Sequence, residues 1–429
     1  MDSVSEPPSR PSASTTGLDV RPFRALTYRQ QDPGHLARVS SPAYDLVTPA
    51  GRQRLAESDP HNIVRLILPA VDEAAGPERS AEAAAAALRR WQEEGVLARD
   101  GEPALWLYEL RPADGGPPTT GWLGAVALPP TGSTAVLPHE DTYPVAVAGR
   151  RALLAATRTD LEPIVLAHDA EPVVAEVTDR VRQLPPTMSV RDADGVGHRL
   201  WRVADADSVD RLRQALARTE AVIADGHHRF AAARAHHRAD SGSVLALLTP
   251  MGPGGLRVDP IHRVIPDLDL DAAVRAASSG FRVTELTTTG AGVAAGVQRW
   301  AADPGGGGDF VVTDGSRLFR LDQPSEDLRA SVPAEAPPAW RGLDVVLAHH
   351  GLIERLWHRR DDPASVLIAH SVDEALRLAA ERSGVALVLR APSPGDVAAV
   401  ARAGARMPRK STLFVPKPRT GLVMRPLEG

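Results

Sequence analysis

Apolar and polar residues follow one another in short runs along the chain, and turn-forming residues separate the runs. The apolar runs 104–108 and 122–128 flank Asp114-Gly115-Gly116-Pro117, which predicts a β-hairpin. Residues 187–192 and 199–203 flank a glycine-rich turn and predict a second hairpin. The N-terminal half therefore contains antiparallel strand pairs.

Other segments have the spacing of amphipathic helices. Residues 80–94 are rich in Ala, Arg and Glu and place Leu88 and Trp91 on one side, which predicts a helix. Further helices are predicted at 208–218, 230–239, 343–357 and 372–382, and further strands at 221–224, 244–249, 310–312 and 385–389. Because helices and strands alternate in no regular order, we predict an α+β fold of mixed sheets with packed helices.

The length of 429 residues predicts two or three lobes. Residues 1–18 are rich in Ser, Pro and Thr and are predicted to be a disordered tail. We predict an N-terminal α+β lobe at 19–205. A second α+β lobe is predicted at 206–429, with a C-terminal segment that returns to the functional site.

Composition and charge narrow the class of protein. The net charge is −5 and no block of five or more Lys and Arg occurs, so we expect no nucleic-acid partner. No run of eighteen apolar residues occurs, so we expect no membrane partner. The chain has no cysteine, which excludes disulfides, thiolate nucleophiles and Cys-ligated zinc and fits a cytoplasmic location.

The first candidate site is the run Asp225-Gly226-His227-His228-Arg229, between a predicted strand and a predicted helix. Gly226 permits a tight turn, and the helix start exposes N–H groups with a partial positive charge. Arg229 is expected to add a bidentate fork for phosphate or carboxylate. The histidines are candidates for acid–base groups, and Asp225 for a helix cap or an acceptor of a substrate hydroxyl. The run therefore predicts a site for a small anionic metabolite.

Metal binding is a second interpretation of the same run. His227 and His228 are adjacent and diverge on a helix, and no cysteine is available, so a zinc site is less favoured than an anion site. The sequence does not identify a metal.

Four other clusters contain chemically active side chains. His139, Glu140 and Asp141 suit proton transfer or a divalent cation, although a solvated loop gives the same pattern. Arg151 and Arg158 are seven residues apart and are expected to share one face of a helix.

The remaining clusters lie near the two ends of the chain. Tyr44 and Asp45 belong to a predicted turn, and Lys410, Ser411 and Thr412 are residue types that often bind phosphate. No Gly-x-x-x-x-Gly precedes Lys410, so this is not a Walker A loop.

Together these motifs resemble a bacterial and archaeal family known as domain of unknown function 1015. The resemblance rests on the following residues, in order: Arg21-Pro22-Phe23-Arg24-Ala25, Pro42-Ala43-Tyr44-Asp45, His61-Asn62 with Arg65, His139-Glu140 with Thr142, Ala156-Thr157-Arg158 with Pro163, Ala224 to Arg229, His262-Arg263-Val264, Met407 to Phe414, Pro416-Lys417 and Gly421. It covers nearly the whole chain beyond the tail. Ala43 and Leu413 stand where a proline and an aromatic residue are usual.

The Gly226 to Arg229 turn also resembles the phosphate-binding box of the ParB/sulfiredoxin superfamily. That group includes CTP-binding partition proteins, sulfiredoxins and a free-serine kinase. Sulfiredoxin chemistry needs a cysteine, and partition proteins carry a helix-turn-helix and a basic surface, so the kinase is the relevant member. The resemblance implies a ParB/sulfiredoxin-like subdomain and points to serine or phosphoserine as substrate.

The leading hypothesis is phosphotransfer or phosphoester hydrolysis on a small hydroxylated metabolite. Gly226 and Arg229, with Arg158, Tyr44, Asp45 and residues 410–412, are expected to bind substrate or phosphate; Asp225, His227, His228, His139 and Glu140 are expected to be catalytic. Mg²⁺ is the expected cofactor because it neutralises phosphate charge, and the phosphate donor is not identified.

The alternatives are a nucleotide-binding, ParB-like regulator and a metal-dependent hydrolase of another substrate. A homo-oligomer is compatible with the sequence. We also predict that the separated clusters converge in space, because no single cluster contains both an anion cradle and a base.

Overall fold

The computed structural model describes residues 17–70, 76–237, 242–252, 254–288, 292–303, 308–360 and 362–427. By internal contacts the chain divides into two compact units. Unit 1 comprises Met1–Leu137, Tyr143–Pro250 and Pro418–Gly429, and unit 2 comprises Pro138–Thr142 and Met251–Lys417. The division falls at residue 250 rather than at the predicted 205, because the strands that follow residue 205 pair into the sheet of unit 1.

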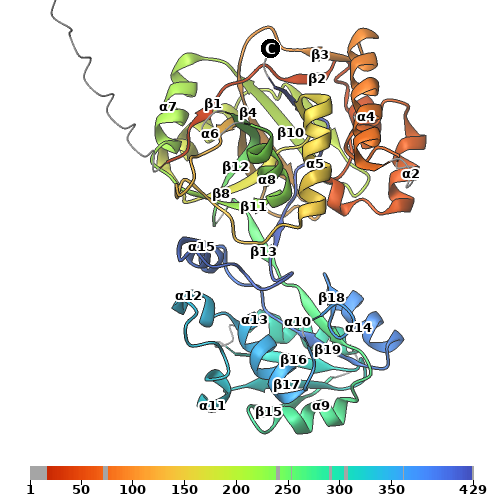
Figure 1. Cartoon of the computed structure of the whole chain (residues 1–429), viewed down its shortest axis with the longest axis vertical. Coiled ribbons are helices and arrows are strands. Elements are labelled where there is room, and N and C mark those ends of the chain that lie inside the picture. Colours follow the sequence, from red (N-terminus) through yellow and green to blue (C-terminus); the bar gives the residue numbers. More distant parts are fainter. Residues whose placement is uncertain are drawn as a thin grey trace, which may run out of the picture. The chain divides into compact units, whose positions relative to one another are not determined.

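Unit 1 is built on a nine-stranded mixed sheet. Its strands are β1 (Val20–Arg21), β4 (Leu105–Arg111), β5 (Thr119–Ala127), β6 (Val136–Leu137), β8 (Ile164–His168), β9 (Met188–Arg191), β10 (Gly197–Val203), β11 (Ala221–Asp225) and β12 (Ser243–Pro250). The order is β6-β11-β8-β12-β5-β4-β10-β9, and β1 pairs with β5 (Figure 1). Two small ribbons join β2 (Leu26–Tyr28) to β3 (Leu97–Arg99), and β7 (Thr159–Asp160) to β21 (Arg425–Pro426).

Helices cover both faces of this sheet. They are α1 (Pro33–Val39), α2 (Pro49–Ser58), α3 (Val64–Ile67), α4 (Gly76–Glu93), α5 (Pro144–Thr157), α6 (Pro172–Arg182), α7 (Ala206–Leu216), α8 (His227–His236) and the 3₁₀ turn η1 (Tyr44–Leu46). Successive side chains of a strand point to opposite faces. Leu105 and Leu107 of β4 accordingly join a cluster with α6, α7 and α8, whereas Trp106 and Tyr108 join one with α1, α3 and α4.

The predicted elements of unit 1 are present with shifted ends. The antiparallel pairs β4–β5 and β9–β10 are the two predicted hairpins. Leu88 and Trp91 are buried on α4, as their spacing predicted. Helix α8 begins at His227, three residues before the predicted start, because Gly226 adopts a left-handed conformation that lets the helix follow β11 directly.

Unit 2 contains a six-stranded antiparallel sheet of order β15-β17-β16-β19-β14-β18. The strands are β14 (His262–Ile265), β15 (Arg282–Leu286), β16 (Phe310–Thr313), β17 (Leu318–Asp322), β18 (Leu367–Ala369) and β19 (Val385–Val388), and β13 (Arg257–Asp259) pairs separately with β20 (Leu413–Val415). The helices are α9 (Leu270–Ala277), α10 (Gly292–Ala302), α11 (Glu326–Arg329), α12 (Pro338–Arg341), α13 (Asp344–Leu347), η2 (Ala348–Leu356), α14 (Val372–Glu381) and α15 (Pro394–Arg402).

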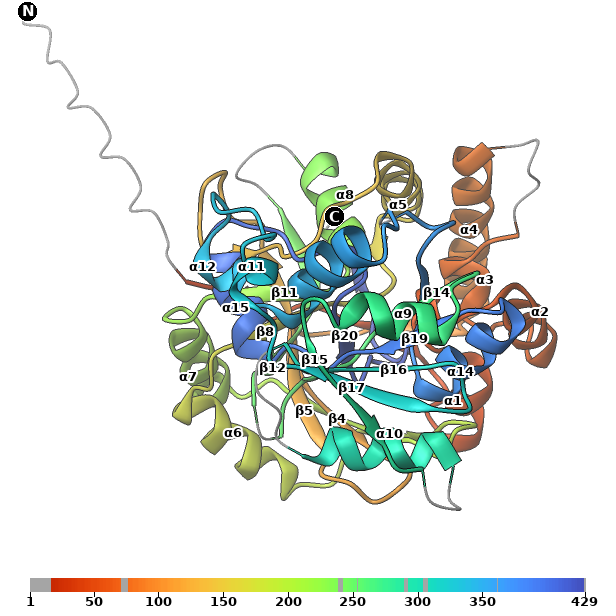
Figure 2. The same ribbon diagram turned by 90° about the horizontal axis from the view of Figure 1, so that it is seen from below.

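Two layers of helices enclose the unit 2 sheet. Helices α10 and α14 pack on the face that carries Val311, and α9 contacts β16 on the opposite side (Figure 2). The helix predicted at 343–357 is present, but beyond Leu347 it widens into the π-helix η2. The antiparallel sheets and packed helices of both units confirm the predicted α+β class.

The boundary of the N-terminal tail differs from the prediction. Residues 1–16 lie outside the described residues. Leu18 is buried, and its N–H donates to the carbonyl groups of Leu216 and Thr219. Leu18, which was predicted to belong to the tail, is therefore packed against unit 1.

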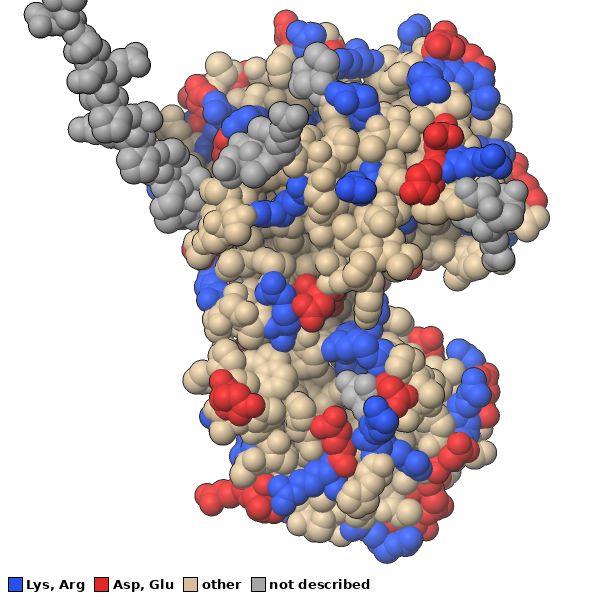
Figure 3. Space-filling model, in the orientation of Figure 1, with Lys and Arg blue, Asp and Glu red and all other residues tan. Residues whose placement is uncertain are grey.

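Two surface properties bear on the expected partners. Among the described residues, no helix is both long enough and apolar enough to cross a membrane. Figure 3 shows basic and acidic side chains interspersed on the face that it presents.

Candidate functional site

The candidate site in unit 1 begins at the turn from β11 into α8. Gly226 has φ of 94°, and a Cβ there would lie 2.8 Å from Ile164 Cγ2 and 3.1 Å from Arg229 Nε. Helices α7 and α9 begin with Asp205 and Asp269, whose side chains accept first-turn N–H groups, but Gly226 offers α8 no such acceptor. The start of α8 is therefore suited to an acceptor from elsewhere.

The Arg229 guanidinium is held by protein groups. Nη1 donates to the Pro163 carbonyl oxygen at 2.6 Å, and Nη2 pairs with the Asp225 carboxylate. Nε is buried and has no hydrogen-bond partner among the described residues. Burial lowers the pKa of Arg229, but Asp225 and Glu162 more than offset this and keep the pKa raised. Arg229 therefore fixes the turn through Nη1 and Nη2, and its binding of a phosphate or carboxylate stays a prediction.

Tyr44 lies at the centre of the same cluster. Its ring lies beneath the guanidinium of Arg150, 3.8 Å from ring centroid to Cζ, and 5.5 Å from that of Arg229. Its backbone N–H donates to Glu162 Oε1 at 3.1 Å, and the Thr420 hydroxyl donates to the same oxygen at 3.0 Å. Burial raises the pKa of the Tyr44 hydroxyl, while the two guanidinium groups oppose that shift.

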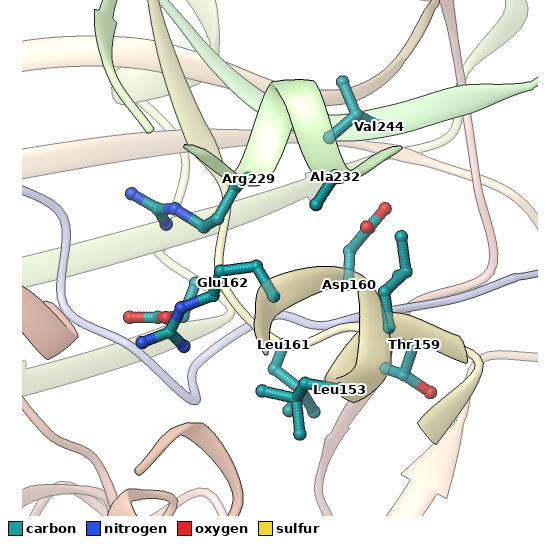
Figure 4. Close-up of a pocket in the computed structure, with 10 residues that line it drawn as sticks. Leu153, Thr159, Asp160, Leu161, Glu162, Arg229, Ala232 and Val244 are labelled. Atoms are coloured by element: carbon teal, nitrogen blue, oxygen red, sulfur yellow. The ribbon is translucent and has the colours of Figure 1, made fainter. Parts of the chain in front are cut away.

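A small cavity opens beside this cluster (Figure 4). It is lined by Arg150, Leu153, Leu154, Thr159, Asp160, Leu161, Glu162, Arg229, Ala232 and Val244. Its volume of about 50 Å³ holds a few water molecules, since one water needs roughly 10–15 Å³ by the same measure. The cavity is therefore too small for a whole nucleotide.

The two histidines of the turn are in contact with neighbouring residues. His227 is buried. His228 Nε2 accepts the Tyr143 backbone N–H at 3.1 Å, and the two rings stack with centroids 5.8 Å apart. A neutral His228 consequently carries its proton on Nδ1. Among the described residues, no three His, Asp or Glu side chains are grouped so as to hold a metal ion.

The predicted row of arginines on one helix face is not formed. Arg158 lies beyond the end of α5 in a left-handed conformation with φ of 48°, so it does not continue the helical spacing from Arg151. Arg151 is exposed. The arginine of α5 that lines the cavity is Arg150, whose Nη1 also donates to the Ile67 carbonyl oxygen at 3.0 Å.

Unit 2 contains a second group of predicted residues. The Thr412 hydroxyl lies 3.0 Å from His139 Nε2 and donates to Glu140 Oε1 at 3.0 Å. The Met407 N–H donates to the His139 carbonyl oxygen, and Arg406 lies 3.7 Å from the Asp141 carboxylate. His139 is buried and Glu140 is half-buried, so these two residues are docked on unit 2, whereas Asp141 and Thr142 are exposed.

The other predicted residues occupy different environments. Lys410 and Asp45 are exposed. Ser411 is buried, and its hydroxyl donates to the Pro408 carbonyl oxygen. The structure thus brings Tyr44, Asp225 and Arg229 together in unit 1, and His139, Glu140 and Thr412 together in unit 2; convergence of the two groups stays a prediction.

Two residues of the unit 1 cluster, Glu162 and Thr420, were missed by the sequence interpretation. Glu162 directly precedes Pro163 of a quoted motif, so it lay beside a recognised signal. Thr420 had no local signal, because its contact with Glu162 joins residues 258 positions apart.

The fold and site define an α+β protein with a glycine-started helix at a strand end and an arginine–carboxylate cluster beside it. The chain belongs to the DUF1015 family, whose description is protein of unknown function and whose model matches residues 20–346. This confirms the family resemblance noted from the motifs. No curated protein matches the chain.

Several solved structures have a distant likeness to the chain. A free serine kinase in complex with AMP has 13% identity and a TM-score of 0.31, over 66% of this chain and 84% of that one. SbnI from Staphylococcus aureus, with a C-terminal truncation, has 12% identity and a TM-score of 0.34, over 71% and 87%. A conserved hypothetical protein from Pyrococcus furiosus has 13% identity and a TM-score of 0.30, over 66% and 87%.

Proposed function

We propose that unit 1 binds the phosphate of a small hydroxylated metabolite at the start of α8, and that the protein transfers or hydrolyses that phosphoryl group. One observation carries the proposal: the N-cap of α8 is the left-handed Gly226, which has no side chain to cap the helix, and Arg229 of the first turn lines a cavity together with Arg150. The first N–H groups of a helix and its dipole favour a bound anion.

In this proposal Arg229 positions the turn before α8, and Arg150 supplies positive charge to the bound phosphate. Asp225 and the Pro163 carbonyl hold Arg229, so Arg229 keeps the turn in place and adds positive charge without reaching out as a fork. Arg150 donates from Nη1 to the Ile67 carbonyl oxygen and is one of the residues that line the cavity, where its charge would offset that of the phosphate. The small cavity admits the phosphoryl end of a ligand only.

The proposed reaction is attack of a hydroxyl or water oxygen on phosphorus. The bond from phosphorus to the leaving oxygen breaks, and the attacking group gives its proton to a base. Asp225, His227, His228, His139 and Glu140 are the proposed acid–base groups. Serine and phosphoserine are the proposed substrates, a suggestion that comes from the resemblance to the free-serine kinase box.

The residues of unit 1 fit Mg²⁺ only as an ion held mainly by its phosphate ligand. Asp225 is paired with Arg229, and Glu162 accepts from Tyr44 and Thr420, so neither carboxylate is poised for a dedicated metal cage. Mg²⁺ in phosphoryl-transfer sites often uses one or two carboxylates together with substrate oxygens. When bound, the ion would neutralise phosphate charge.

The test is a calorimetric titration with inorganic phosphate and with phosphoserine, with and without Mg²⁺. Arg150→Gln should weaken phosphate binding by about tenfold, since a charged hydrogen bond contributes roughly 1.5–3 kcal/mol. Arg151→Gln is the matched control, because Arg151 is the next residue and is exposed. Equal affinities of the two variants would contradict the proposal.

Turnover separates an enzyme from the alternative of a nucleotide-binding regulator. Incubation of phosphoserine, or of serine with a nucleoside triphosphate or diphosphate, should give phosphate, serine or phosphoserine in many-fold excess over protein. Binding without such excess product would favour the regulator. Elemental analysis of the purified protein tests the third alternative, a metal-dependent hydrolase.

A further inference from the structure

A second, larger pocket lies in unit 2 and shares no lining residue with the cavity of unit 1. Its volume is about 340 Å³, which is within the usual range for small-molecule sites. It is lined by Pro338, Ala339, Gly342, Leu343, Asp344, Val345, Arg390, Ala391, Pro392 and Asp396. These residues come from α12, the start of α13, and the loop that leads into α15.

Asp344 is the polar centre of this pocket. Its Oδ1 accepts the Gly308 N–H at 2.6 Å, and its other carboxyl oxygen has no hydrogen-bond or ion-pair partner among the described residues. Burial, with a smaller contribution from Asp309, raises the pKa of Asp344, against the opposing effects of the Gly308 N–H, Arg390 and Arg329. A half-buried carboxyl group in a pocket gains from a ligand that donates hydrogen bonds.

Arg390 does not supply that donor. Its Nη2 bonds Asp309 and the Trp300 carbonyl, and its Nη1 donates to the Ala301 carbonyl. Its Nε is shut off from solvent and has no partner among the described residues. The guanidinium also packs over the Trp300 ring at 4.1 Å. The positive charge of Arg390 is thus paired with Asp309, and the hydrogen bonds of its two Nη atoms go to Asp309, Trp300 and Ala301.

The remaining charged group of the pocket is also acidic. Asp396 caps α15 together with Ser393, in a reciprocal capping box. The start of α15 is therefore already supplied with acceptors and does not invite an anion. Two carboxyl groups and one internally compensated guanidinium line the pocket, and the remaining walls are mostly Pro, Ala, Leu and Val.

We infer that this pocket binds a small organic cation, with an ammonium group at Asp344 and an apolar body against Leu343, Val345 and Pro392. The ammonium would donate to the unpartnered carboxyl oxygen and neutralise the buried charge. This site is independent of the proposed phosphate chemistry in unit 1, and nothing in that proposal requires it.

The experiment is ligand-observed NMR on the full chain with three probes of similar shape: n-butylamine, n-butyrate and 1-butanol. Butylamine should bind at millimolar concentration, and butyrate should not. Asp344→Asn keeps an acceptor for the Gly308 N–H and should weaken butylamine binding by about tenfold, which corresponds to about 1.4 kcal/mol. Asp373→Asn, an exposed position at the start of α14, is the control with the same change of charge.

A second variant tests the pocket without altering its charge. Ala339→Phe should fill the space and block butylamine while leaving phosphate binding at unit 1 unchanged. Equal binding of the three probes, or butylamine binding that neither variant weakens, would overturn the inference. Preferential binding of butyrate would do the same, because it would show an anion site.

Discussion

Arg229 forms an ion pair with Asp225 across the left-handed Gly226, so the last residue of β11 and the first turn of α8 are joined by their side chains. Both side chains are largely buried, with 12% and 16% of their surfaces exposed. The pair fixes the direction in which the chain leaves the sheet. It thereby also fixes the direction in which the first N–H groups of α8 point.

Removal of the Asp225 charge should destabilise unit 1. Asp225→Asn removes the charge that pairs with the buried Arg229 and leaves its hydrogen bond to the Pro163 carbonyl, and we expect a loss of about 1.5–3 kcal/mol in the free energy of unfolding. Urea unfolding measures this. Asp179→Asn is the control: the Asp179 side chain is 75% exposed and lies 3.7 Å from Arg182, so its loss should change stability by less than about 0.5 kcal/mol. Similar losses for both variants would show that the Asp225–Arg229 pair stabilises the protein no more than an exposed ion pair does.

The glycine of the turn should be irreplaceable for two reasons that can be separated. Gly226→Ala combines a positive φ with a close approach to Ile164 and Arg229. Gly115→Ala meets only the first difficulty, because φ is 77° and no atom lies within 4 Å of its Cβ position. We expect Gly226→Ala to cost about 1–3 kcal/mol more than Gly115→Ala in urea unfolding. Equal costs would mean that the close approach relaxes freely.

The N-terminal boundary can be tested by two truncations. Removal of residues 1–16 should leave the melting temperature almost unchanged, because this polar segment has no periodic apolar face. Removal of residues 1–18 also deletes buried Leu18, and should cost a further 1.5–3 kcal/mol or so for a fully buried leucine. Calorimetry of both truncations checks this, and identical melting temperatures would contradict the packing of Leu18.

Sequence patterns predicted what depends on neighbours along the chain. The hairpins and α4 followed from alternation, turn residues and helical spacing, all of which are local. The clusters in the site depend on distant pairs: Glu162 meets Thr420 across 258 residues, and His139 meets Thr412 across 273. No local pattern shows such pairings. The pairing of Arg229 with Asp225 was also missed. A Gly-His-His-Arg run is compatible both with an arginine that binds a ligand and with an arginine that pairs with a carboxylate of the protein.

The buried His262 should make stability depend on pH. Burial, together with Arg263 and His370, lowers its pKa to about 4. An unfolded chain has a histidine pKa of about 6.5, so between these values the unfolded state binds the extra proton. Stability from this group is complete above about pH 6.5 and should fall by about 3 kcal/mol as the pH drops to 4.

The variant His262→Asn isolates this contribution. Asn keeps an acceptor for the Leu389 N–H, which donates to His262 Nδ1 at 3.3 Å. The pH dependence of urea unfolding between pH 4 and 7 should be shallower than in the natural protein. His358→Asn, at an exposed position, should keep the original slope. An unchanged slope in His262→Asn would assign the pH dependence to other groups.

The last prediction concerns Thr412, whose hydroxyl joins His139 and Glu140. Thr412→Val keeps the shape of the side chain but removes the hydroxyl, so both neighbours lose a hydrogen-bond partner in a partly buried place. We expect a loss of about 1–3 kcal/mol in the free energy of unfolding. Thr412→Ser keeps the hydroxyl and should be much less harmful, and urea unfolding compares the two.

The same pair of variants tests whether Glu140 acts in the proposed reaction. A general base must be held within hydrogen-bond reach of the proton that it takes, and the Thr412 hydroxyl donates directly to the Glu140 carboxylate. If Glu140 is the base, Thr412→Val should lower kcat for phosphate release from phosphoserine and leave KM nearly unchanged, while Thr412→Ser restores kcat. If Thr412→Val loses stability but keeps its kcat, the contacts among His139, Glu140 and Thr412 have a structural role only. The general base would then be Asp225, His227 or His228.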